Sequence, residues 1–222
     1  MRSATAPRDY TAFRARRDDC EARNVVVQRA TERRFVPVKF ALDTNASRFT
    51  VQAFATGMLS TFGHNPKIAI RDYDGELQFA PDTCENSVVR VTVRTSSMDV
   101  QDEMSGDDRK KLEQTMYDVL EVQRFPSAVF ESKQITVQKQ TEDLLLAQAT
   151  GALSFHGVTQ TQALSARVTR LGTMLRISGD FSLRQSDYAI KPVSFAGGAL
   201  RLKDELKFAF ELVARMQEEA SA

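Results

Sequence analysis

Reactive side chains are scarce in this chain of 222 residues, which has two histidines, two cysteines and no tryptophan. Cys20 and Cys84 lie far apart in the sequence and form no recognisable framework, so we expect two free thiols. This scarcity excludes multi-cysteine zinc modules, disulfide-rich scaffolds and most histidine-rich metal sites. We therefore expect neither a metal ion nor a cofactor.

A dominant charge and long apolar runs are also missing. Thirty basic and twenty-nine acidic residues leave a net charge of +1, which gives no general electrostatic reason to bind nucleic acid. No apolar run approaches the ~18 residues needed to cross a bilayer, and residues 1–10 contain no apolar signal-peptide core. As the sequence stands, we expect a cytoplasmic protein without stable membrane insertion.

The small positive charge conceals an uneven distribution along the chain. Residues 1–34 contain nine arginines and five acidic residues, which leaves this segment with a net charge of +4. The segment has little hydrophobic periodicity, so we interpret it as an extension that is either a solvated surface segment or a basic docking arm. The predicted organisation is an extension over 1–34, one domain over 35–215 and a tail over 216–222.

Apolar residues of the domain recur at every second position, as in half-buried antiparallel strands. The pattern is clear at Val89–Val93 and at Leu175–Phe181, and Leu171–Thr173 has the character of a hairpin turn. It continues for 13 positions over Leu200–Leu212, which predicts one strand of about 44 Å. About eight such strands indicate an all-β fold, an antiparallel barrel.

One region has the period of a helix instead. Leu112, Met116, Val119 and Leu120 form an apolar stripe, and Ser105 precedes it as a capping residue. We expect this amphipathic helix to be inserted between strands and to end before Pro126, since proline disfavours helix in the residue before it.

The interior of an eight-stranded barrel is either filled by side chains or holds one small ligand. The chain has fourteen phenylalanines and seven methionines, and the inward faces consist of phenylalanine, leucine, valine, isoleucine and methionine. A hollow interior would therefore take an apolar ligand, and long strands would suit a long one. A solid core built from the same residues is the alternative.

Two histidines stand in turn-like segments at strand ends, His64 after Gly63 and His156 before Gly157. Neither has a second histidine at metal-ligand spacing, and no nucleophile elbow occurs. Each is interpreted as a hydrogen-bonded loop anchor, with a polar contact at the barrel mouth as the alternative. Asp204 interrupts the last apolar alternation, which indicates either a bulge that turns it outward or a polar anchor for a ligand.

Four motifs follow one another along the domain: Phe62-Gly63-His64-Asn65, Phe125-Pro126-Ser127-Ala128-Val129-Phe130, Gly151-Ala152-Leu153-Ser154-Phe155-His156-Gly157 and Gly179-Asp180-Phe181-Ser182-Leu183. Their order and spacing resemble the YceI-like family over about residues 40–213. The resemblance implies an extended, lipocalin-like barrel around a tunnel for a polyisoprenoid, quinone or related lipid. It also implies a periplasmic or secreted location as the alternative to the cytoplasm, and a homodimer as one arrangement. Ala189 stands where the family often has glycine.

Our leading hypothesis is a non-enzymatic carrier of a long-chain apolar lipid. The candidate ligand-binding residues are Phe49, Val51, Phe79, Met98, Met116, Leu120, Phe130, Phe155, Phe181, Phe208 and Phe210, with His64, His156 and Tyr188 as candidate polar contacts. The alternatives are a hydrolase or isomerase of a lipid-like substrate with His64 or His156 as base, and a solid-core interaction module that uses the basic extension.

Overall fold

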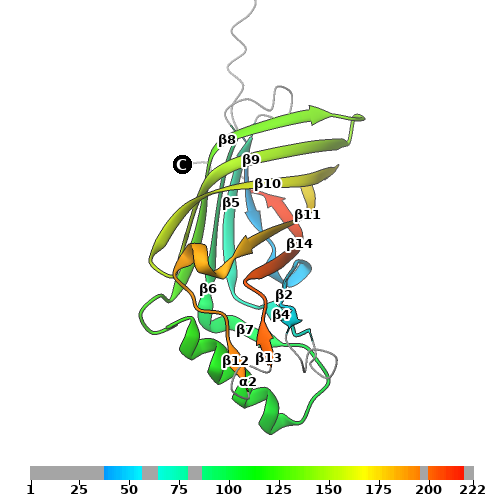
Figure 1. Cartoon of the computed structure of the whole chain (residues 1–222). Coiled ribbons are helices and arrows are strands. Elements are labelled where there is room, and N and C mark those ends of the chain that lie inside the picture. Colours follow the sequence, from blue (N-terminus) through cyan, green and yellow to red (C-terminus); the bar gives the residue numbers. More distant parts are fainter. Residues whose placement is uncertain (1–37, 57–64, 80–86, 196–199, 218–222) are drawn as a thin grey trace, which may run out of the picture. The chain divides into compact units, whose positions relative to one another are not determined.

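The computed structural model describes residues 38–56, 65–79, 87–195 and 200–217, all within one compact unit that begins at Pro37. The predicted extension over 1–34, His64, Cys20 and Cys84 lie outside the described residues. Eight antiparallel strands form the barrel (Figure 1): β1 (Val38–Leu42), β5 (Tyr73–Phe79), β6 (Val88–Arg94), β8 (Ser127–Lys139), β9 (Leu144–Phe155), β10 (Val158–Leu171), β11 (Met174–Arg184) and β14 (Glu205–Met216).

The barrel closes because β1 pairs with β14 as well as with β5. Leu42 lies opposite Ala214 in the closing pair, and the strand order around the barrel is β1-β5-β6-β8-β9-β10-β11-β14. Every pairing is antiparallel. Because β1 also pairs with β14, the ring of eight strands has no free edge where it closes. The predicted eight-stranded antiparallel barrel is confirmed.

Additional strands extend the wall beyond β14. The N-terminal half of β14 pairs with β2 (Arg48–Gln52). In the sheet, β2 then pairs with β4 (Lys67–Ile70), and β4 pairs with β7 (Met98–Val100). A small second sheet consists of β12 (Ser194–Phe195), β13 (Leu200–Leu202) and β3 (Ala55–Thr56). Three short 3-10 turns join strands: η1 (Thr44–Ala46), η2 (Thr95–Ser97) and η3 (Gln185–Tyr188).

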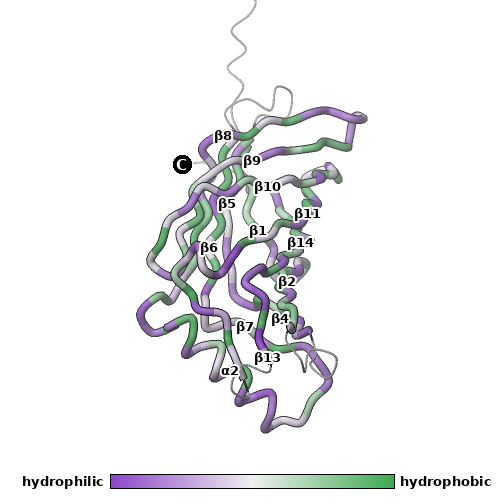
Figure 2. The backbone as a smooth tube through the Cα atoms, in the orientation of Figure 1, coloured by the Kyte–Doolittle hydropathy of each residue, from purple (hydrophilic) through white to green (hydrophobic). Residues whose placement is uncertain are grey.

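The alternation of residue types explains which face of each strand is inside. On β11, Leu175 and Ile177 are buried while Arg176 between them is exposed, and β9 repeats the pattern. Figure 2 shows the same alternation of hydrophilic and hydrophobic residues along the strands. A bulge in β8, where the register shifts between Ser132 and Gln134, keeps both Phe130 and Ile135 on the inner face despite their odd spacing.

The prediction of one continuous strand over Leu200–Leu212 is wrong. The chain forms β13, leaves the strand conformation at Lys203 and Asp204, and then begins β14 in the other sheet. Asp204 causes the break through contacts with η3: its carboxylate accepts hydrogen bonds from the amide and hydroxyl of Ser186, at 2.8 and 2.6 Å. The Asp204 carbonyl also accepts from the Gln185 amide. Asp204 is therefore a structural anchor at a strand break.

The inserted helix is confirmed as α2 (Gly106–Val119), which follows β7 and lies at the end of the barrel opposite the β8–β9 hairpin (Figure 1). Ser105 caps it by accepting a hydrogen bond from the Asp108 amide at 3.1 Å, and Asp107 and Asp108 favour the positive end of the helix dipole. Within the described ranges, no helix is long and apolar enough to cross a membrane.

Candidate functional site

The barrel encloses a cavity that follows the strands for most of their length. Along β9 its lining reaches from Leu145, beside the β8–β9 hairpin, to Phe155 at the helix end, roughly 34 Å of extended chain. The volume of this cavity is about 220 Å³. An engineered cavity of about 150 Å³ is enough to hold benzene, so the interior has room for a ligand.

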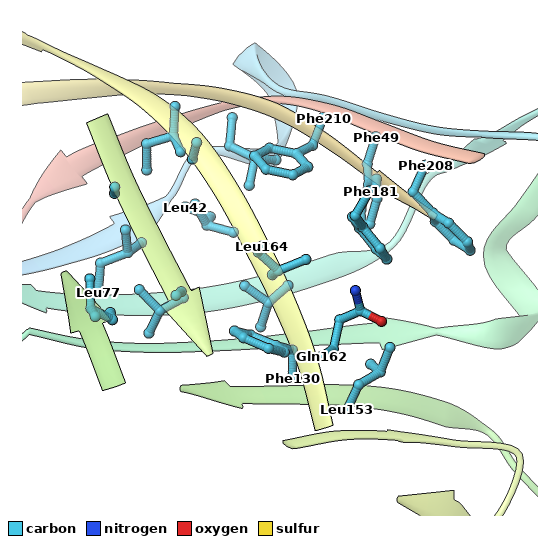
Figure 3. A pocket seen from close by; sticks show the side chains of 18 of the residues that line it. Leu42, Phe49, Leu77, Phe130, Leu153, Gln162, Leu164, Phe181, Phe208 and Phe210 are labelled. Atoms are coloured by element: carbon cyan, nitrogen blue, oxygen red, sulfur yellow. The ribbon is translucent and has the colours of Figure 1, made fainter. Parts of the chain in front are cut away.

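The cavity exists because small residues occupy inward positions where large ones would fill the space. Ala147 on β9 and Ala166 on β10 lie directly opposite each other, and both line the cavity. Many inward side chains of the barrel, such as those of Leu164 and Phe181, are only half-buried, because they face this hollow rather than packed atoms (Figure 3). The solid-core alternative is therefore wrong for the barrel.

Two glycines bring aromatic rings close to the wall. A Cβ at Gly151 would collide with the Glu131 carbonyl oxygen and lie 2.8 Å from the Phe130 ring. A Cβ at Gly179 would lie 2.6 Å from the Phe210 ring. The absent side chains let both rings cover the backbone of a neighbouring strand, so that they line the cavity without crossing it.

Four phenylalanines gather on one side of the cavity (Figure 3). Phe181 and Phe208 are stacked with centroids 4.7 Å apart and planes at 10°. Phe49 approaches Phe208 and Phe210, at centroid distances of 6.2 and 6.4 Å. Such rings offer large apolar surface with little loss of side-chain freedom when a ligand binds.

None of the described residues that line this cavity carries a charge. Its polar lining residues are Gln78 and Ser87, which lie where β5 ends and β6 begins, and Gln162 on β10. Figure 3 shows the Gln162 amide among apolar side chains, with Phe181 and Phe208 above it. Its nitrogen donates to the carbonyl of Ala163 at 2.9 Å. The environment thus suits an uncharged chain and penalises an ion.

A second, smaller cavity lies beneath α2. The volume of this cavity is about 80 Å³. Its lining includes Leu112, Met116 and Val119 of the helix and Val51 of β2. Met98, Phe155 and Phe208 line both cavities. The two spaces are therefore separated by a shared wall of three side chains.

The family model of the YceI-like domain matches residues 40–214, which is most of the chain. The chain belongs to the YceI-like family. The resemblance inferred from the sequence motifs is thus confirmed. No curated protein matches the chain.

Solved structures show the same fold as this YceI-like chain at low sequence identity. BcnA of Burkholderia cenocepacia superposes with a TM-score of 0.61 at 17% identity, covering 78% of this chain and 98% of BcnA. A polyisoprenoid-binding domain of Saccharophagus degradans, implicated in plant cell wall breakdown, gives 0.59 at 14% identity, covering 81% and 99%. The YceI protein of Campylobacter jejuni gives 0.52 at 19% identity, covering 71% and 88%. At such identities the likeness establishes the fold of the YceI-like domain.

All eleven apolar residues proposed from the sequence line one of the two cavities of this YceI-like domain. Those on the barrel cavity are Phe49, Phe79, Met98, Phe130, Phe155, Phe181, Phe208 and Phe210. Val51, Met116 and Leu120 line the second cavity alone. Sequence reasoning missed Gln162, although it stands two, four and six positions before Leu164, Ala166 and Val168 and so shares their inward face.

The structure places the two described candidate polar contacts outside both linings. Tyr188 is only 2% exposed, and its ring packs against Phe155 with centroids 5.6 Å apart. Burial raises the pKa of Tyr188, so its hydroxyl is a neutral group at ordinary pH. Tyr188 thus supports a lining residue from behind.

His156 occupies the β9–β10 turn with a positive φ of 50° and is 8% exposed. Its Nδ1 lies 3.0 Å from the Tyr188 carbonyl oxygen, which requires the proton on Nδ1 because a carbonyl only accepts. Its Nε2 lies 3.5 Å from a Glu121 carboxylate oxygen, and its ring packs on Phe125 at 4.5 Å. These contacts tie together the turn, η3 and the segment after α2.

Within the described part of the chain, no three histidine, cysteine or acidic side chains are grouped to hold a metal ion. Acidic side chains instead form ion pairs with arginines, as Asp43 does. Asp43 contacts Arg215 at 2.7 Å, and this hydrogen bond holds the pKa of the Asp43 carboxyl below its usual range.

Proposed function

We propose that this YceI-like domain is a non-enzymatic binding protein that holds the apolar chain of a long-chain lipid, of the polyisoprenoid class, along the barrel axis. The observation that carries the proposal is the uncharged cavity that runs from Leu145 to Phe155 along β9. A long and narrow apolar space fits a long and flexible apolar chain better than a compact ligand.

The energetics favour such a ligand. Each methylene removed from water contributes about 0.8 kcal/mol, so a chain that fills the cavity gains enough to offset the loss of its own conformational freedom. No charged contact is needed for tight binding. The low polarity of the lining also explains why a chain without charges is preferred, since an ion inside would lose its hydration without compensation.

The fold comparison supports the ligand class. One structural neighbour, the domain from Saccharophagus degradans, is described as a polyisoprenoid-binding domain, and it covers 81% of this chain. Small lining residues toward the β8–β9 hairpin, such as Ala147 and Ala166, leave room for the methyl branches of an isoprenoid chain.

The polar lining residues suggest how the ligand is oriented. Gln78 near the end of β5 and Ser87 just before β6 lie at the end of the cavity away from α2, whereas Met98 and Phe155 at the helix end are apolar. The polar end of the lipid would therefore lie beside Gln78 and Ser87, with its apolar end directed toward α2.

A binding role is favoured over catalysis by where the titratable side chains lie. The rival hypothesis uses His64 or His156 as a base. His64 lies outside the described residues, and His156, whose Nδ1 contacts the Tyr188 carbonyl oxygen, lines neither cavity. A base must come within hydrogen-bond reach of the proton it removes. Among the residues that the structure describes, a ligand in the barrel would meet amide, hydroxyl and hydrocarbon groups rather than a base.

Blocking the cavity from within tests the proposal. Ala166→Phe directs a ring into the barrel, and Ser165→Phe is the matched control because Ser165 is the exposed neighbour on β10. We expect the first variant to weaken binding of geranylgeraniol at least tenfold in fluorescence-displacement titrations, and the control to leave it within twofold. Equal affinity in both variants, with folding verified by circular dichroism, would place the ligand elsewhere and overturn the proposal.

A further inference from the structure

The helix α2 covers its cavity without filling it. Leu112, Met116 and Val119 form the apolar stripe of the helix, yet all three are only half-buried, and no residue of α2 is fully buried. A surface helix normally gains its stability by packing such a stripe against a core. Here the stripe faces an apolar cavity.

Polar contacts hold the helix over this space. The Tyr117 hydroxyl donates to the Met98 carbonyl at 2.8 Å, and a Glu113 carboxylate oxygen accepts from the Val100 amide at 3.1 Å. The Arg109 guanidinium donates to the Asp102 carbonyl at 3.0 Å. These bonds fix α2 to β7 and the segment after it, so the position of the helix does not depend on filling the cavity.

The polar residues in the lining do not make this space polar. The Thr115 hydroxyl donates to the Lys111 carbonyl at 2.8 Å, and the Gln185 amide nitrogen donates to the Lys203 carbonyl at 2.9 Å. The Thr115 hydroxyl hydrogen and one side-chain N–H of Gln185 are thus used within the protein. The remaining described lining residues are apolar, so the space offers a ligand hydrocarbon contacts.

The wall toward the barrel is one side chain thick. Met98, Phe155 and Phe208 each line both cavities. Met98 is the adaptable member of this wall, because an unbranched side chain with three rotatable bonds can move aside without shifting the backbone. Phe208 and Phe155 are held by their neighbours, Phe181 at 4.7 Å and Tyr188 at 5.6 Å. A passage therefore opens most readily at Met98.

We propose that the cavity beneath α2 is a terminal compartment of the ligand site, which takes the apolar end of a chain too long for the barrel cavity. This inference rests on the proposed function, since it assumes that the barrel holds a lipid chain. The occupant is the unsubstituted hydrocarbon end of that same chain. The compartment makes affinity depend on chain length: short chains stay in the barrel, and long chains pass Met98 and gain contacts with the helix.

Two prenols of different length test the compartment. Met116→Trp fills the space beneath α2, and Lys110→Trp on the exposed face of the helix is the matched control. We expect Met116→Trp to weaken binding of solanesol, with nine isoprene units, by about tenfold. Farnesol, with three units, should bind the wild type and both variants within twofold. Equal solanesol affinity in the wild type and the filled variant would overturn the compartment.

A photoreactive probe keeps the test independent of whether Met116→Trp folds. Wild-type protein is irradiated with solanesol that carries a diazirine at its apolar end, and the labelled peptides are identified by mass spectrometry. We expect labelling within residues 106–120. Labelling confined to barrel strands would refute the compartment while leaving the proposed function intact, and failure of both prenols to bind would refute the proposed function itself.

Discussion

The ring of Phe181 on β11 lies parallel to that of Phe208 on β14, at 4.7 Å and 10°, where the two strands pair directly. The pair forms part of the cavity wall, and Phe208 also faces the space beneath α2. The stacked pair thus connects the stability of the barrel to the shape of the ligand site.

Removing one ring should cost stability without collapsing the barrel. We expect Phe181→Ala to lower the free energy of unfolding by about 2–3 kcal/mol, less than for a fully packed phenylalanine, because the ring already faces a hollow. Val88→Ala, at a side chain that is 48% exposed, should change it by less than about 0.5 kcal/mol. Urea unfolding measures both, and equal losses would contradict the assignment of Phe181 to the wall.

The close approach of Phe210 to Gly179 predicts a steric effect. A Cβ at Gly179 would meet the Phe210 ring and the Ser165 carbonyl oxygen, so Gly179→Ala should destabilise the fold by about 1–3 kcal/mol. Gly106→Ala is the control: nothing lies within 4 Å of a Cβ there, and alanine is the better helix former. Thermal unfolding should rank Gly106→Ala at or above the wild type, and Gly179→Ala clearly below it.

Ala189 has a positive φ of 58°, the left-handed conformation that favours glycine. Ala189→Gly should relieve this strain and raise stability by about 0.5–1 kcal/mol. The opposite sign is expected for Ala152→Gly on β9, because glycine weakens a strand interior. Chemical denaturation of both variants is the measurement, and a loss of stability in Ala189→Gly would show that the turn tolerates alanine without strain.

Asp204 predicts how stability changes in acid. Its hydrogen bonds with Ser186 lower the pKa of its carboxyl from the usual value, so the folded state binds this proton less readily than the unfolded state. The stabilisation is present above the unfolded pKa and is lost as the pH falls through the folded value. Asp204→Asn should therefore lower the melting temperature at neutral pH and reduce its fall toward about pH 2. An unchanged acid profile would show that the Asp204 contacts do not contribute.

Much of this fold could be predicted from the residue pattern, because alternation records which side of a strand is buried. It identified the inward phenylalanines of β2, β8, β11 and β14 and the apolar stripe of α2. The sequence indicates an irregularity at Asp204 but not the full break between two strands, since the residues that contact Asp204 there, Gln185 and Ser186, lie 18 or more positions away.

The division of the interior into two cavities could not be predicted from the sequence either. It depends on where α2 sits relative to Met98, Phe155 and Phe208, and helical periodicity gives a face but not a packing distance. The sequence favours His156 as a hydrogen-bonded loop anchor and gives a polar contact with the ligand, for His156 as for Tyr188, as the alternative. His156 Nδ1 contacts the Tyr188 carbonyl oxygen, and neither residue lines a cavity.

Gln162 should be the most sensitive position in the lining for introducing charge. Gln162→Glu places a carboxylate among apolar side chains, so we expect at least a tenfold loss of geranylgeraniol affinity at neutral pH and recovery in acid as the carboxyl is protonated. Gln148→Glu, on the exposed face of β9, should have no such effect. Equal behaviour of the two variants in titrations at several pH values would remove Gln162 from the ligand path.

The central claim, that the barrel holds a long apolar lipid, is tested most directly by native mass spectrometry of the protein purified without detergent. The account predicts a bound mass that disappears on organic extraction and returns, one lipid per chain, when solanesol or another polyprenol is added. A single apo mass before and after addition of polyprenol, from protein shown to be folded, would contradict it.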